Sequence, residues 1–440
     1  MESPSAALRP ARSARLLSSQ ALLSCLLLFG ANSLHAENWP QWRGPDGNGI
    51  SSAPAAPLKW SATENVRWRT PLPGPGGATP VIWGERIFVT SVDGDELVLL
   101  CIDTAGKQLW RNVVSTGNKD VRGDEGNSAS PSPCTDGRHV WAFMGNGALA
   151  CYDIDGKQVW KLDVQDRYGK LNIAFGMTST PVLDKGRLFL QLIHGEGNPQ
   201  TREAKVVALD AATGAELWSA DRPSDASREC EHSYASPILY RDDSGEQLIT
   251  HGADYVVSYD AGNGKELWRC GELNPKGNYN PTLRFVASPV ATDGAIIVPS
   301  AKNGPVLSLS PRGKGDITSA APYRLWTRER NTPDVPSPLV HDGVVYLCRE
   351  NGTLICVDLA SGEELYQERV HGQRHRASPV YAAGHLYMSA RDGRVSVVKT
   401  GRKFELVAQN DLNEALSASP AIADGVLYLR TFDALYAIGK

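Results

Sequence analysis

The sequence lacks the short motifs that identify most metal, redox and hydrolytic sites. None of its eight cysteines belongs to a Cys-x-x-Cys or Cys-x-x-Cys-His arrangement, so structural zinc, thioredoxin-like and c-type haem sites have no support. No Gly-x-Ser-x-Gly elbow, Walker loop or His-Glu-x-x-His pair occurs either, and these motifs carry hydrolase, nucleotide and zinc-protease chemistry. Catalytic classes with a recognisable local motif are therefore not indicated.

An apolar run long enough to span a bilayer is also missing. The run of residues 16–30 follows Arg9, Arg12 and Arg15, whereas a membrane-spanning helix needs about 20 apolar residues. Small residues then lead to Ala36. A basic start, a short apolar core and a small-residue exit are typical of a secretory signal peptide over residues 1–36, which predicts a secreted or periplasmic protein.

A lipid anchor is a second way to hold such a protein at a membrane. Residues 22–25 faintly match a lipoprotein cleavage box, in which Cys25 would carry the lipid. The apolar core continues through residues 26–29, past that cysteine. This continuation argues against cleavage there, so we expect neither a lipid anchor nor a membrane span.

A strong charge of one sign is absent as well. Residues 1–36 hold three arginines and one glutamate, which leaves 42 basic and 48 acidic residues and a net charge of −6 in the remainder. No long basic run and no alternation of basic and aromatic residues occurs. The charge therefore predicts no nucleic-acid partner.

What the sequence does contain is one pattern repeated eight times. Each copy opens with a Ser-Pro or Thr-Pro step, and the opening prolines stand 41 to 56 residues apart. Repeats of this length built from several short strands indicate a propeller or an array. The eight prolines are Pro80, Pro133, Pro181, Pro237, Pro289, Pro338, Pro379 and Pro420.

Each copy predicts four short strands joined by tight turns. In the sixth copy, β-branched and aromatic runs alternate with Asp-Gly, Asn-Gly and Ser-Gly turns over residues 337–369. Connections this short require antiparallel neighbours. The predicted fold is therefore all-β, an eight-bladed β-propeller of four-stranded antiparallel blades.

The two ends of the repeat predict how the ring closes. The last copy stops at Lys440 without its fourth strand, and the missing piece matches residues 64–69. We expect this N-terminal strand to complete the eighth blade, because closure removes exposed strand edges; an open solenoid is the alternative. The predicted domains are a signal peptide (1–36), an N-terminal leader (37–63) and the propeller (64–440).

Tryptophan recurs near the end of most copies, four residues after the hairpin glycine in the first four. A structural element recurs in every blade, whereas a single cofactor site does not. We therefore expect these side chains to pack between blades, since a large flat ring buries much area. They are Trp68, Trp110, Trp160, Trp218, Trp268 and Trp326, with Tyr366 at this position in the sixth copy.

Seven cysteines follow residue 36. Cys101, Cys151 and Cys356 each stand two residues before an aspartate in the third strand of their copies, which fits small buried hydrophobic residues. A two-residue turn at Asn351-Gly352 would pair Cys348 with Ile355 and turn Cys356 to the other face, so we expect no bridge between these two cysteines.

The repeat resembles the pyrroloquinoline-quinone (PQQ)-type propeller repeat, as in VVSYDAGNGKELWRC and VVALDAATGAELWSA. That superfamily contains quinoprotein alcohol dehydrogenases and the BamB-type outer-membrane assembly lipoprotein. The leader at residues 38–49 looks like the start of secreted propellers that are common in planctomycete-like bacteria and mostly of undefined activity.

The resemblance to quinoprotein dehydrogenases implies a quinone in the central funnel, a calcium ion with acidic and amide ligands, a catalytic aspartate and a disulfide between adjacent cysteines. This chain has no adjacent cysteine pair, and no loop has a specific calcium spacing. We therefore expect no required cofactor and no metal site, with PQQ and calcium as the alternative.

The loops between blades predict where a binding site lies. They vary in length on one face of the ring, and variation on one face of a repeat array marks its binding face. Asp124 and Glu125 lie in one such loop. The residues predicted to form a polar ligand site at the channel mouth are Glu231, His232, Tyr234, Arg284, Arg374, His375 and Arg376; a solvated rim with local salt bridges is the alternative.

Two functions follow from these observations. The first is a non-catalytic binding or scaffold protein, without catalytic residues, that holds an unknown protein or small ligand through its variable face, as the BamB resemblance implies. The second is a divergent PQQ-dependent oxidoreductase. We expect a monomer in either case.

Overall fold

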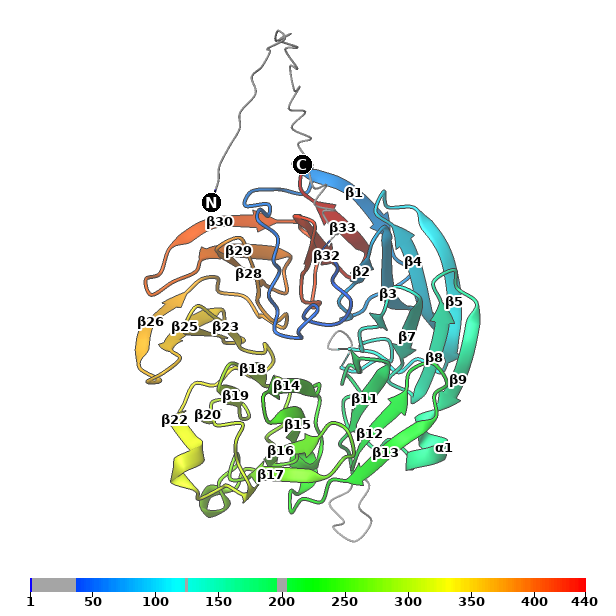
Figure 1. The fold of residues 1–440 in the computed structure, drawn as a ribbon. Coiled ribbons are helices and arrows are strands. Elements are labelled where there is room, and N and C mark those ends of the chain that lie inside the picture. Colours follow the sequence, from blue (N-terminus) through cyan, green and yellow to red (C-terminus); the bar gives the residue numbers. More distant parts are fainter. Residues whose placement is uncertain (2–36, 123–125, 196–203) are drawn as a thin grey trace. The chain divides into compact units, whose positions relative to one another are not determined.

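The computed structural model describes residues 1, 37–122, 126–195 and 204–440. Eight sheets follow one another around a central axis, and each sheet forms one blade of a β-propeller (Figure 1). The predicted all-β fold of eight blades is confirmed. In the described part of the chain, no helix is long and apolar enough to cross a membrane.

The strands of each blade run antiparallel from the channel outward, in the order of the chain. The first two blades consist of β2 (Val81–Trp83), β3 (Arg86–Asp93), β4 (Glu96–Asp103) and β5 (Gln108–Thr116), then β6 (Cys134–Thr135), β7 (His139–Phe143), β8 (Ala148–Asp153) and β9 (Gln158–Asp163). The third and fourth consist of β10 (Val182–Asp184), β11 (Arg187–Leu192), β12 (Lys205–Asp210) and β13 (Glu216–Asp221), then β14 (Ile238–Asp242), β15 (Gly245–Gly252), β16 (Tyr255–Asp260) and β17 (Glu266–Cys270).

The second half of the ring repeats this order. The fifth and sixth blades consist of β18 (Val290–Thr292), β19 (Ala295–Pro299), β20 (Val306–Leu309) and β22 (Arg324–Arg328), then β23 (Leu339–His341), β24 (Val344–Cys348), β25 (Thr353–Asp358) and β26 (Glu364–Arg369). The seventh and eighth consist of β27 (Val380–Ala382), β28 (His385–Ser389), β29 (Arg394–Lys399) and β30 (Leu406–Asp411), then β31 (Ala421–Ala423), β32 (Val426–Arg430), β33 (Ala434–Ile438) and β1 (Val66–Pro71). Single helical turns lie in the connections, namely α1 (Val164–Tyr168), η1 (Arg228–Glu231), η2 (Lys276–Asn278) and η3 (Ala321–Tyr323).

The ring closes as the sequence predicts. Strand β1 pairs antiparallel with β33, and Thr70 lies opposite Leu435. One blade departs from the predicted four strands: β21 (Gly315–Asp316) pairs parallel with β17 and adds a fifth strand to the fourth blade. This strand belongs to the long connection between β20 and β22, which folds back over the neighbouring blade.

Six tryptophans each link one blade to the next. Each donates its indole N–H to a backbone carbonyl of the following blade, as Trp110 does to Ile154 at 3.2 Å. Each also covers the hairpin glycine of that blade: a Cβ atom built on Gly156 would lie 2.8 Å from the Trp110 ring. Only glycine fits under the ring. The same pair of contacts is made by Trp68, Trp110, Trp160, Trp218, Trp268 and Trp326.

The leader seals the seam at which the repeat lacks this tryptophan. In the seventh blade Ala408 takes the equivalent position, opposite Val397 and next to the strand bulge. Trp60 of the leader is buried there and stacks on Tyr387, with ring centroids 6.4 Å apart. Its backbone N–H donates to Asn410 Oδ1 at 3.0 Å. The leader therefore packs as part of the propeller.

The register at the sixth blade corrects one prediction. Cys348 lies opposite Leu354, not Ile355, because the turn has three residues instead of two. Cys356 consequently lies on the same face as Cys348, and both belong to one apolar cluster. The predicted opposite facing was wrong, although both cysteines are free thiols.

Candidate functional site

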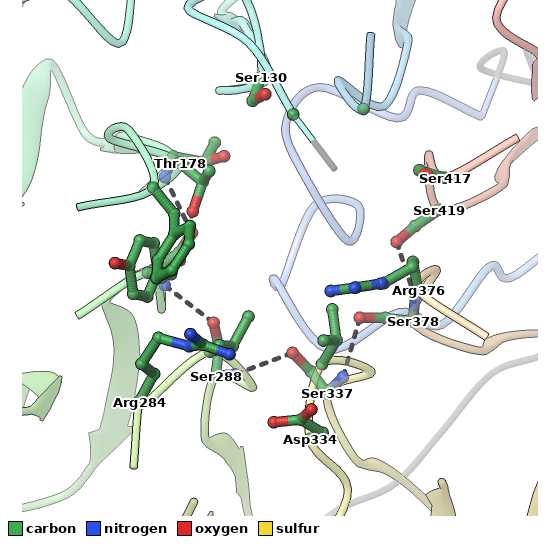
Figure 2. A pocket seen from close by; sticks show the side chains of 18 of the residues that line it. Ser130, Thr178, Arg284, Ser288, Asp334, Ser337, Arg376, Ser378, Ser417 and Ser419 are labelled. Carbon is green, nitrogen blue, oxygen red and sulfur yellow. Dashed lines mark hydrogen bonds between the residues drawn. The ribbon is translucent and has the colours of Figure 1, made fainter. Parts of the chain in front are cut away.

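A cavity of about 340 Å³ opens at the centre of the ring. Its outer part is lined by residues from the loops that join blades and from the loops between second and third strands, such as Arg284 and Glu350. The loops that join blades are those that the sequence marks as variable. Arg284 and Arg376 extend into the cavity from opposite sides (Figure 2).

The leader crosses the channel axis at the inner end of the cavity. Gln41 accepts a hydrogen bond from the backbone N–H of Leu183 in the third blade, and the fully buried Arg43 donates to the carbonyl of Pro338 before the sixth blade. Trp42 stands between these two anchors and lines the cavity. In Figure 1 this segment, drawn in dark blue, runs across the middle of the ring.

A belt of hydroxyl groups surrounds the cavity at the level of the Ser-Pro steps. From Ser132 onward, the serine or threonine before each opening proline accepts a hydrogen bond from the backbone N–H of its counterpart in the preceding blade; the N–H of Ser288, for example, donates to Ser337 Oγ at 2.9 Å (Figure 2). The chain of bonds runs through Thr79, Ser132, Thr180, Ser236, Ser288, Ser337, Ser378 and Ser419, and Thr79 Oγ1 closes it by donating to the Ser419 carbonyl. The repeated step therefore ties the blades together around the axis.

One wall of the cavity is built around Phe175. The guanidinium carbon of Arg122 lies 4.3 Å from the centroid of this ring, and that of Arg284 lies 4.5 Å from it. Tyr234 approaches the same ring at 6.0 Å. Arg284 also forms an ion pair of 3.0 Å with Glu229. Stacking on one aromatic face holds a guanidinium in place without neutralising its charge.

The two lining carboxylates within the described residues, Asp334 and Glu350, lie on the opposite wall. Lys302 Nζ lies 3.8 Å from carboxylate oxygens of both Asp334 and Glu350. Glu350 Oε1 also lies 3.3 Å from Arg374 Nε and 3.4 Å from Arg376 Nε. Burial raises the pKa of Asp334, helped by the charge of Glu350, whereas Lys302 and Arg376 oppose this shift. Each carboxylate is thus already engaged by cations of the wall.

Four of the seven predicted site residues line the cavity, namely Tyr234, Arg284, Arg374 and Arg376. Glu231, His232 and His375 are buried outside its lining. Burial lowers the pKa of His232 and takes that of His375 to about 4. Both rings are therefore neutral at pH 7 and add no positive charge to the mouth. Asp124 and Glu125 lie outside the described residues.

Sequence reasoning missed several lining residues. Lys302 and Glu350 stand at equivalent positions, each one residue before an Asn-Gly turn between second and third strands. A charged residue repeated at that position is a signal that the sequence offers. Arg122 and Phe175 lie in connections between blades, where no recurring pattern marks them, and Trp42 belongs to the leader.

Among the described residues, the lining of the cavity does not fit a calcium ion that holds a quinone. Calcium takes six to eight oxygen ligands, several of them carboxylates, whereas Asp334 and Glu350 each contact Lys302. Within the described ranges no group of three or more His, Cys, Asp or Glu side chains could hold a metal ion. The seven described cysteines are buried within the fold and none adjoins another.

Comparison with known proteins identifies relatives of two kinds. Residues 53–125 and 95–368 match the family model described as outer membrane protein assembly factor BamB. A polyvinylalcohol dehydrogenase from Pseudomonas sp is 27% identical over 192 residues, which are 40% of this chain and 28% of that protein. An outer membrane protein assembly factor BamB from Alteromonas naphthalenivorans is 27% identical over 178 residues, 40% of this chain and 39% of that protein. The chain therefore spans well under half the length of these curated relatives.

Solved structures show the same fold. BamB from Moraxella catarrhalis superposes with a TM-score of 0.58 at 13% identity, over 82% of this chain and 93% of the other. A europium-containing methanol dehydrogenase superposes with a TM-score of 0.68 at 11% identity, over 90% of both chains. Identity this low carries the architecture, and the same architecture serves assembly factors and dehydrogenases alike.

Proposed function

We infer a function from the premise that this chain belongs to the family described as outer membrane protein assembly factor BamB, since the family model matches most of it. We propose that it is a non-catalytic binding propeller, and that its ligand or partner engages the loop-bearing face around the central cavity. Fold alone does not decide this, because relatives with the same fold include dehydrogenases.

One observation carries the proposal. The two carboxylates among the described lining residues, which are candidates for a base or for metal ligands, are both held by cations of the same wall: Lys302 contacts Asp334 and Glu350, and Arg376 contacts Glu350. A general base must be able to reach the proton that it abstracts. Carboxylates used as counter-ions instead fix the positions of the cations, which suits binding.

The experiment that tests this proposal uses PQQ and calcium. The purified protein is mixed with both and assayed for a bound-quinone spectrum and for alcohol-dependent reduction of a dye. We expect no turnover. A quinone spectrum together with alcohol-dependent turnover would contradict the proposal. It would support the alternative function, a PQQ-dependent oxidoreductase, which the match to a polyvinylalcohol dehydrogenase favours.

We further propose that the protein acts outside the cytoplasm as a monomer, after removal of residues 1–36. The basic start and the short apolar core support export. Intact-mass measurement of the protein from the periplasm or medium should give a chain that begins at Glu37. A chain that begins at a lipid-modified Cys25 would instead indicate a lipoprotein.

A further inference from the structure

The hydroxyl belt leaves its donors available to the cavity. A serine or threonine hydroxyl has one donor and two acceptor positions. Within the described residues, the hydroxyl oxygen accepts a backbone N–H, and no hydrogen bond uses the hydroxyl hydrogen, in seven members of the belt: Ser132, Thr180, Ser236, Ser288, Ser337, Ser378 and Ser419. All seven are more than nine-tenths buried and line the cavity.

The charged side chains add further donors. Arg122, Arg284, Lys302, Arg374 and Arg376 line the cavity. Lys302, Arg374 and Arg376 contact Glu350, and Arg284 forms its ion pair with Glu229. Among the described residues no ion pair involves Arg122, whose guanidinium is held by its stack on Phe175. Among the described residues, the cavity therefore offers an occupant one arginine without an ion pair together with seven unused hydroxyl donors, and an occupant with oxygen acceptors and negative charge suits these groups.

The size and the floor of the cavity limit that occupant further. A volume of about 340 Å³ lies at the lower end of the range of small-molecule pockets. Trp42 presents a large aromatic ring on the leader, between the anchors at Gln41 and Arg43. An aromatic floor accepts a flat or apolar face of a ligand.

We propose that the cavity binds a small organic carboxylate. The carboxylate lies at Arg122 and Arg284, beside Phe175, while the remaining oxygens accept hydrogen bonds from the hydroxyl belt and one face packs on Trp42. The inference rests on the proposed function only in taking the channel mouth as the binding face. It assigns to the leader a part of the binding site.

The first test compares an acid with its neutral counterpart. Titration calorimetry of the full protein is run with D-glucuronate, D-glucose and, without calcium, PQQ, which carries several carboxylates. We expect saturable binding of glucuronate, of PQQ or of both, weakened by salt, and none of glucose. Binding of glucuronate points to acidic sugars and binding of PQQ alone to aromatic acids. If neither acid binds, or if glucose binds equally well, the inference is wrong.

Variants locate the site. Replacing Arg122→Gln together with Arg284→Gln should weaken binding of the acid at least tenfold, because charged hydrogen bonds are lost. Trp42→Ala should weaken it several-fold. Arg138→Gln is the matched control, since this exposed arginine lies in the turn between β6 and β7, away from the cavity lining. Unchanged affinity in the double variant, with an unchanged melting temperature, would overturn the assignment.

The two proposals fail in different ways. Alcohol-dependent turnover with PQQ and calcium would end the non-catalytic proposal, yet acid-selective binding at Arg122 and Arg284 could still be measured. Absence of acid-selective binding would contradict this inference. The proposal that a protein partner binds the same face would not be affected.

Discussion

The seams between the blades are sealed in two different ways. Between the fourth and fifth blades, Trp268 is fully buried, donates to the Pro311 carbonyl at 3.2 Å and covers Gly313. Between the seventh and eighth blades, the repeat offers Ala408 instead, and Trp60 of the leader packs at that seam. The first seam is closed by the repeat and the second by a segment outside it.

This difference shows why the leader is part of the fold. Six seams use a tryptophan of a blade's fourth strand, and the seam between the sixth and seventh blades pairs Tyr366 with Phe404, whose ring centroids lie 5.8 Å apart. The seventh blade has Ala408 at this position in place of an aromatic residue, and Ala56, Leu58 and Trp60 of the leader belong to the apolar cluster at this seam. The same segment continues from the residues that floor the cavity, which links stability to the binding site.

The largest effect is expected at the repeat-built seam. Trp268→Ala removes a fully buried ring, the bond to Pro311 and the bond to Gln247 Oε1 at 3.1 Å. We expect the free energy of unfolding to fall by about 3–5 kcal/mol, measured by urea denaturation followed by circular dichroism. Trp268→Phe should recover part of the loss, since it keeps the packing. A loss below 1 kcal/mol would show that the ring is not an anchor.

A smaller loss is expected at the leader-built seam. Trp60 is also buried, but its indole N–H has no partner in the described part of the chain. Removing an unpaired buried donor offsets some of the lost packing. Trp60→Ala should therefore cost about 2–3 kcal/mol by the same denaturation measurement. If its cost equals that of Trp268→Ala, the two seams are energetically equivalent and the comparison fails.

The sequence predicts the repeat-built seams far better than the leader-built one. Equal offsets between the hairpin glycines and Trp110 or Trp218 reveal a shared structural role, because every blade repeats the same packing. The ring closure by residues 64–69 follows from the missing last strand. Nothing in the spacing indicates that Trp60 substitutes for the absent ring, since that contact joins positions more than 300 residues apart.

The candidate site was predictable only in part, for a related reason. Loop position places Arg284 and Arg376 at the channel mouth, because every connection between blades reaches the same face. Loop position does not indicate which side chains turn towards the cavity. The sequence therefore predicts His375 as a site residue, although this side chain is buried outside the cavity lining. The stack of Arg122 on Phe175 joins two different loops between blades, and the sequence of neither loop indicates this contact.

A pH-dependent loss of folding stability is expected from His375, at the mouth end of the seam between the sixth and seventh blades. His375 is fully buried there, its Nδ1 lies 2.9 Å from the Gln373 carbonyl, and burial takes its pKa to about 4. His371 also lowers this pKa, whereas the Gln373 carbonyl and Asp392 oppose the shift. Below pH 6.5 the unfolded chain binds a proton that the folded chain does not, so stability falls as the pH drops from 6.5 towards 4.

The measurement is denaturation at pH 7 and at pH 5. By pH 5 the linkage through His375 amounts to about 2 kcal/mol. In His375→Gln, which cannot take up that proton, the difference between the two pH values should shrink by this amount. An unchanged difference would mean that another group controls the acid response.

The smallest effect is expected in the hydroxyl belt, and it should not depend on the seam. Ser337→Ala leaves the N–H of Ser288 without its acceptor, and Ser419→Ala does the same to Ser378. Because water in the cavity can replace the lost hydroxyl, each change should cost about 1 kcal/mol. Ser337→Thr should cost little, since Thr180 already serves at this position. Equal costs at the two sites would show that the belt is uniform around the ring, although the outer seams differ. A larger cost at Ser419 would mean that the belt also differs at the seam that the leader closes.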